Sequence, residues 1–152
     1  MTDTTLALSL EGIYSAINTA LQAEMSSGGK LAGVVTLIPT YTGQIKTPLP
    51  ALGYYGELMN QPEIQTMGKR EVWELPLYLV AICRGDVPLT AMTNANTYAA
   101  QARAAIKATD RLGLDYVTGI TSGRFLPAQA HNEDRSVFGA VAHMNIGFTA
   151  TL

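Results

Sequence analysis

Three residues follow one another in the order of a hydrolytic triad. The segment Gly119-Ile120-Thr121-Ser122-Gly123 has the outline of a nucleophile elbow with threonine in the serine place, and Asp134 and His143 come later in the chain. An elbow must turn from a strand into a helix, whereas here Arg124-Phe125-Leu126-Pro127 follows and the chain ends at Leu152. We therefore expect a strand that ends in a glycine turn and no enzyme, with a small hydrolase as the enzymatic alternative.

The remaining reactive side chains do not form a site at ligand spacing. Gly28-Gly29-Lys30 lacks the leading glycine and the final serine or threonine of a phosphate loop. His131 and His143 have no second histidine or cysteine near them in the sequence, and Cys83 is the single cysteine. We expect no metal and no cofactor, and we expect Cys83 to be a small apolar core residue.

Composition favours one folded domain spanning residues 1–152. Charged residues make up only 14% of the chain against a usual share of about 25%, so much of the surface must be neutral, which is typical of a surface covered by a partner. The net charge of −2 does not suit a protein that grips DNA. The longest apolar run, Leu75 to Cys83, is too short to cross a membrane, which takes about 20 residues, and no signal-peptide pattern opens the chain.

Two segments have the apolar spacing of amphipathic helices. The first runs from Leu6 to Glu24, although Leu6, Leu8 and Leu10 also alternate, so that an extended arm followed by a helix capped at Ser9 is the alternative. The second lies between Thr93 and Leu112, with Thr93 or Asn94 as its cap, Gly113 as its stop and many alanines for close packing.

Strand patterns occupy most of the remaining chain. We expect strands at 34–38, 51–58, 71–83, 116–121 and 138–152, the last with strict alternation, and loops at 59–71 and 122–136. Pro76 predicts an edge position or a bulge for its strand. No strand–helix alternation of the parallel kind is present. The sequence therefore predicts an α+β fold, a mostly antiparallel sheet of four to five strands with two main helices on one face.

The arrangement of these segments resembles the tail terminator proteins of long-tailed bacteriophages. The likeness is carried by a proline-led strand at 47–55, a polar loop, a strand that opens near Trp73, an alanine-rich helix, a short strand, a charged loop and a final alternating strand. It covers most of the chain and rests on arrangement rather than on an invariant motif. The region before residue 47 matches only as a helix, and Pro76 departs from the pattern.

The resemblance implies a structural virion protein of the tail and neck, assembled in the host cytoplasm. Such proteins form a ring, a hexamer, that caps the tail tube, stops its polymerisation and joins the tail to the head–tail connector and neck proteins, while DNA passes through without sequence-specific binding. We expect the interface residues in the two polar loops to be Glu63, Lys69, Arg70, Arg124, Asp134 and Arg135. Another neck, connector or tail-tube protein of a phage or contractile injection system is the closest alternative, and a monomeric ligand-binding domain is a further one.

Overall fold

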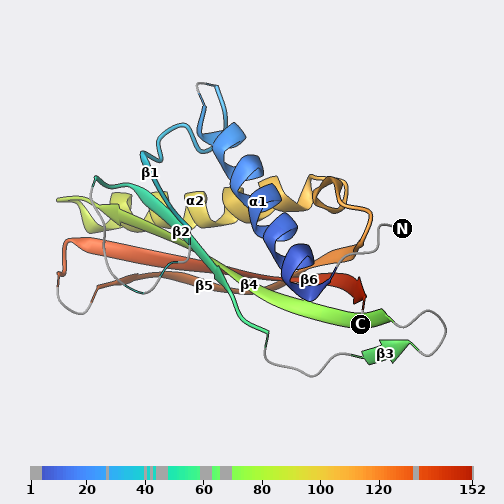
Figure 1. Ribbon diagram of the computed structural model, residues 1–152. Helices are drawn as coiled ribbons and strands as arrows, with labels where there is room; N and C mark the ends of the chain where they lie inside the picture. Colours follow the sequence, from blue (N-terminus) through green and yellow to red (C-terminus); the bar gives the residue numbers. More distant parts are fainter. Residues whose placement is uncertain are drawn as a thin grey trace.

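The protein is a sheet with two helices packed on one of its faces (Figure 1). The computed structural model describes residues 5–26, 28–39, 41, 43, 48–58, 63–65, 70–131 and 134–151. The elements in chain order are α1 (Leu6–Met25), β1 (Thr36–Pro39), β2 (Ala51–Gly56), β3 (Glu63–Gln65), β4 (Arg70–Arg84), α2 (Pro88–Lys107), the 3-10 turn η1 (Arg111–Gly113), β5 (Val117–Ala130) and β6 (Val137–Thr151).

The sheet has the strand order β1-β2-β4-β6-β5, and β3 adds to the outer end of β4. Its centre is the antiparallel pair of β4 and β6, which stays in register from Arg70 opposite Thr151 to Arg84 opposite Val137. Only β1 and β2 are parallel; every other pair in the described sheet is antiparallel. The predicted α+β class with a mostly antiparallel sheet and helices on one face is confirmed.

The first helix begins at Leu6, so the predicted helix is confirmed and the extended-arm alternative is wrong. Thr5 is the N-cap, and its hydroxyl accepts from the Leu8 N–H. Ser9 lies inside the helix, buried, with its hydroxyl donating to the Thr149 carbonyl of β6. Because this bond satisfies a buried hydroxyl, Ser9 anchors α1 to the end of the sheet.

The second helix is displaced from its predicted position: it begins at Pro88 and ends at Lys107. Proline is well suited to the first helical position, where its missing N–H would have no intrahelical partner. Thr93 is not a cap, because its hydroxyl donates to the Leu89 carbonyl within the helix. Gly113 ends the η1 turn, at φ +70, and not the helix.

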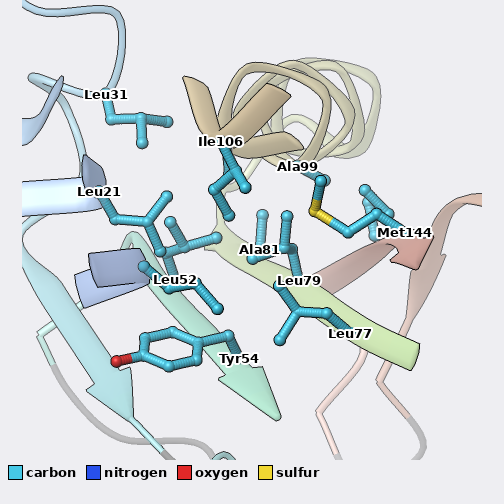
Figure 2. Packing of buried hydrophobic residues seen from close by; sticks show 14 of the residues in the cluster. Leu21, Leu31, Leu52, Tyr54, Leu77, Leu79, Ala81, Ala99, Ile106 and Met144 are labelled. Carbon is cyan, nitrogen blue, oxygen red and sulfur yellow. The ribbon is translucent and has the colours of Figure 1, made fainter. Parts of the chain in front are cut away.

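The core lies between the helices and the inner face of the sheet (Figure 2). Small alanines of α2, such as Ala99 and Ala102, are fully buried and let the helix lie close over β4 and β6. Larger side chains fill the space beside it, including Leu21 from α1, Leu52 and Tyr54 from β2, Leu77 and Leu79 from β4, Ile106 from α2 and Met144 from β6.

β5 is much longer than predicted, since it continues through the expected loop to Ala130. The prediction failed because three register shifts against β6 break the alternation of the sequence, which is the usual effect of bulges. Only residues 131–136 connect β5 to β6. The two strands therefore form a long hairpin at one side of the sheet.

Pro76 does not place its strand at an edge, since β4 pairs with β2 on one side and with β6 on the other. The β2 pairing ends at Gly56 opposite Leu77, and the Pro76 carbonyl then accepts from the Glu57 N–H. In an antiparallel strand, the amide and the carbonyl of one residue point to the same side. The Pro76 carbonyl points toward β2, so the N–H that proline lacks would also have pointed to that side, just beyond the end of the β2 pairing. The proline therefore removes no ladder bond to β6.

Candidate interaction surface

The face of the sheet opposite the helices carries a row of stacked rings. In register, Tyr55 of β2 lies beside Tyr78 of β4, which lies beside His143 of β6. Ring centroids are 4.9 Å apart for the first pair and 4.8 Å for the second, and Tyr41 extends the row at 6.5 Å from Tyr55. Aromatic pairs at these distances stabilise one another beyond their simple burial. The row therefore forms a flat apolar band across three strands.

An apolar cluster lies beside this row on the same face. Val80, Ile82 and Val137 are buried there, with Tyr41 and Leu49 packed against them from the segment between β1 and β2. Farther along, on β5, Leu126 is 52% exposed. An exposed leucine next to half-buried rings is typical of a surface that binds protein, when the apolar area is continuous. We call this face, defined by Tyr55, Tyr78, Leu126 and His143, the open face.

A shallow pocket of about 300 Å³ lies on the open face near the start of β4. Its floor is Gly147 of β6, which stands between Glu74 of β4 and Gly119 of β5 in the strand register. A methyl group on Gly147 would lie 2.8 Å from the Thr118 hydroxyl, so the depression exists because glycine occupies this position. The full lining is Val72, Trp73, Glu74, Thr118, Gly119, Thr121, Asn145 and Gly147.

Arg103 of α2 fastens the bulged part of β5 to β6. Its Nη1 donates to the carbonyls of Gly123 at 3.1 Å, His143 at 3.2 Å and Arg124 at 3.4 Å, and its guanidinium lies 5.6 Å from the centre of the Phe125 ring. A bulge leaves strand carbonyls without ladder partners, and the arginine supplies donors for them. This contact holds the strand carrying the exposed leucine against the rest of the open face.

The surroundings of His143 favour its neutral form. Burial lowers the pKa of His143, and the nearby Arg124 and Arg103 lower it further, against a smaller opposite effect of Glu74. Gly123 gives the imidazole its room, because a methyl group there would clash with Nδ1. A neutral ring stacks on Tyr78 without placing a charge on the open face.

The sequence-predicted interface residues do not gather at one place. Glu63 lies in β3 and Arg70 begins β4, while Lys69 falls outside the described residues. Arg124 is exposed on β5. Asp134 and Arg135 lie in the connection before β6, at the opposite end of β4 and β6, so roughly 45 Å of strand separates them from Arg70.

Asp134 organises that opposite end. Its carboxylate accepts from the Ser136 hydroxyl at 2.6 Å and the Ser136 N–H at 2.9 Å, and it pairs with Arg84 at 3.1 Å. The hydrogen bonds from Ser136 are the main reason why the pKa of Asp134 is lowered. The residue therefore fixes the turn between β5 and β6 to the end of β4.

The triad suggested by the sequence is not assembled in the described structure. Thr121 lies within β5 opposite Asn145 and not at a turn into a helix. Asp134 precedes β6, whereas His143 lies six residues into it, a separation of roughly 20 Å of strand. The three side chains therefore cannot act on one another as a nucleophile, a base and an orienting acid do, which requires hydrogen-bond contact.

The sequence did not indicate that Glu74 and Gly147 would be neighbours, or that Arg103 of α2 would bind carbonyls of β5 and β6. In the structure, the alternation of β6 puts His143, Asn145 and Gly147 on the face away from the core. The same alternation read along β4 would have predicted that Glu74 lies on this face too.

No protein-family model matches the chain, and none of the curated proteins matches it in sequence. Neither helix of the described structure is long and apolar enough to cross a membrane.

Proposed function

We propose that this protein is a structural subunit of a bacteriophage tail, a tail terminator that closes into a ring, a hexamer, at the end of the tail tube. In this role it stops tube polymerisation and joins the tail to the neck proteins, with DNA passing through the ring. The tail assignment rests on the resemblance of the order of elements. The self-association rests on one observation, the open face.

The open face suits contact with another copy of the chain. It has the stacked row of Tyr55, Tyr78 and His143 and the exposed Leu126, and the helices cover only the other face. Protein interfaces are enriched in aromatic residues and depleted in charge at their centres. Charged residues make up only 14% of the whole chain, so charge is also sparse on the rest of the surface.

The outer edge of β5 is poorly suited to open-ended growth by strand addition. Three register shifts and Pro127 interrupt this strand, and the Ala128 N–H is already taken by the side-chain oxygen of Asn96 on α2. Bulges and proline are the devices by which proteins keep edge strands from pairing with other chains. Contact through faces, which can close into a ring, is favoured over a growing sheet.

The two ends of the sheet offer separate contact sites for the tube and the neck. Glu63 and Arg70 lie at one end, and Asp134 and Arg135 lie at the other. A subunit that meets the tube below the ring and the neck above it needs polar groups at both levels. The wide separation of these residues fits that geometry.

A matched pair of leucine variants tests the role of the open face. Leu126→Lys places a charge on the open face, and Leu8→Lys places one on α1 at nearly equal exposure, 52% and 57% for the two leucines. Because a buried unpaired charge opposes association, Leu126→Lys should shift the mass distribution toward monomers while Leu8→Lys leaves the rings intact. Mass photometry over a concentration series, with circular dichroism to verify folding, measures this.

The outcomes separate the candidate functions. Closed rings that Leu126→Lys dissociates support the proposal. Open tubes formed by the wild-type protein would indicate the tail-tube or connector alternative. A wild-type monomer at all concentrations, also in the presence of purified tail tubes, would contradict ring formation and favour a ligand-binding domain.

A further inference from the structure

The pocket over Gly147 has the chemistry of a site for a cationic side chain. Among the described residues that line it, Glu74 is the only charged one and is exposed, and Asn145 and Thr121 add polar groups around the glycine floor. Among the described residues, no cation of the same chain lies within 4 Å of the Glu74 carboxylate. A guanidinium or ammonium group with its stem across Gly147 would therefore complete an ion pair that the chain does not make by itself.

Several of the described arginines and lysines are already engaged or lie where they cannot reach this pocket in a neighbouring copy. Arg103 is bound to three carbonyls and Lys107 donates to Ser122, while Arg124 lies near His143 on the same face as the pocket. Arg84 pairs with Asp134 at the far end of the sheet. Arg111, in contrast, has only the exposed Asp110 at 3.6 Å, with their side chains 52% and 95% exposed. Such a surface pair contributes little stability, so its guanidinium can exchange partners.

Arg111 also lies at the same level of the molecule as the pocket. The η1 turn directly precedes β5, whose first residues, Thr118 and Gly119, line the pocket. The chain between α2 and β5 lies on the helix side of the sheet (Figure 1), whereas the pocket is on the open face. A closed ring joins opposite sides of adjacent subunits at one level along its axis. A ring whose axis runs along the strands would bring these two sites of neighbouring subunits together.

The η1 backbone presents this arginine in an unusual conformation. Arg111 has φ 51 and the following Leu112 has φ 57, both in the left-handed region that residues with side chains rarely occupy. Leu112 is buried in the core and anchors the turn that carries the exposed Arg111. Strained residues of this kind cluster at functional positions.

We propose that in the ring, and resting on the function proposed above, Arg111 of each subunit inserts into the pocket over Gly147 of its neighbour and pairs with Glu74. The occupant of the pocket is therefore a second copy of this chain. The contact joins the helix layer of one subunit to the open face of the next and repeats around the ring.

A charge exchange tests this pairing in the full chain. Glu74→Arg and Arg111→Glu each place like charges together, and each should raise the protein concentration at half assembly by at least about tenfold. The double variant Glu74→Arg/Arg111→Glu restores opposite charges and should return this concentration to within about threefold of the wild-type value. Asp86→Arg with Lys30→Glu is the matched control, because both residues are exposed and neither lines the pocket.

Each outcome bears on one proposal at a time. Weakened single variants with a restored double variant support the Arg111–Glu74 contact. Rings that tolerate both single variants, or a double variant as weak as the singles, would overturn the contact while leaving the ring in place. A wild-type protein that never forms rings would instead refute the proposed function itself.

Discussion

Replacing Arg103 with methionine should destabilise the domain and loosen β5. The guanidinium donates to three carbonyls, of which those of Gly123 and His143, at 3.1 and 3.2 Å, are half-buried, while the bond to Arg124 is longer and exposed. Hydrogen bonds from a charged donor contribute roughly 1.5–3 kcal/mol each. Because the site is only half-buried, we take the lower end for two bonds and nothing for the third, about 3 kcal/mol in total.

Methionine keeps the apolar stem of the side chain against Phe125, so packing loss adds little to this figure. For a domain of this size, about 3 kcal/mol corresponds to a fall in Tm of roughly 6–12 °C. Urea denaturation and calorimetry measure the change, with the exposed Arg135→Met as control. Hydrogen exchange should become faster in the amides around Gly123. A fall in Tm no larger than that of Arg135→Met would refute the view that this arginine holds the bulged strand.

Three further predictions concern the open face and the core. Gly123→Ala should destabilise the domain by about 1–3 kcal/mol in urea denaturation, because its methyl group displaces the His143 ring. Gly119→Ala is the control and should change the urea midpoint little, since no atom lies within 4 Å of its new methyl group. Equal effects of the two variants on the midpoint would contradict this explanation. Burial lowers the pKa of His143 in the folded state, so the unfolded state binds a proton more readily and stability should fall as the pH drops through about 6.5. His143→Gln should reduce the change of the urea midpoint between pH 7.5 and 5.5. An unchanged pH dependence in this variant would argue against a role of His143. Burial raises the pKa of the Cys83 thiol to about 11. Its reaction with a disulfide reagent at pH 8 should therefore be at least roughly a hundredfold slower in the native protein than in guanidinium chloride. Rapid labelling of the native protein would show instead that the thiol is accessible.

Elements with uninterrupted periodicity could be predicted from the sequence. In α1, Ile13, Ile17 and Leu21 recur at helical spacing and are all fully buried. In β6, apolar residues alternate from Phe138 to Phe148 and face the core in the structure. The apolar spacing predicts burial correctly in these elements because each of them packs one continuous face against a single core.

The hairpin of β5 could not be predicted in this way, because its pattern depends on other elements. Ser122, Gly123 and Arg124 are polar or small and have the composition of a loop. They stay extended since β6 supplies a ladder partner and Arg103, some twenty residues earlier in the chain, binds the carbonyls that the bulge frees. The displaced start of α2 has a local cause, Pro88 at the first helical position, that the helix prediction did not use.

The pocket on the open face has no local signal in the sequence. Glu74 and Gly147 become neighbours only through the register of β4 and β6, and Arg111 is placed by the turn that leads into β5. The predicted contact residues Asp134 and Arg135 lie at one end of the sheet, away from the pocket. Which charges can meet depends on strand register, and the register follows from the whole core.

The solution mass of the purified wild-type protein across a concentration series tests the central claim most directly. We expect closed rings, visible in negative stain, with a mass six times the 16.2 kDa of the chain, formed either alone or on the ends of tail tubes. A protein that stays at 16.2 kDa at every concentration and does not bind tail tubes would contradict the account.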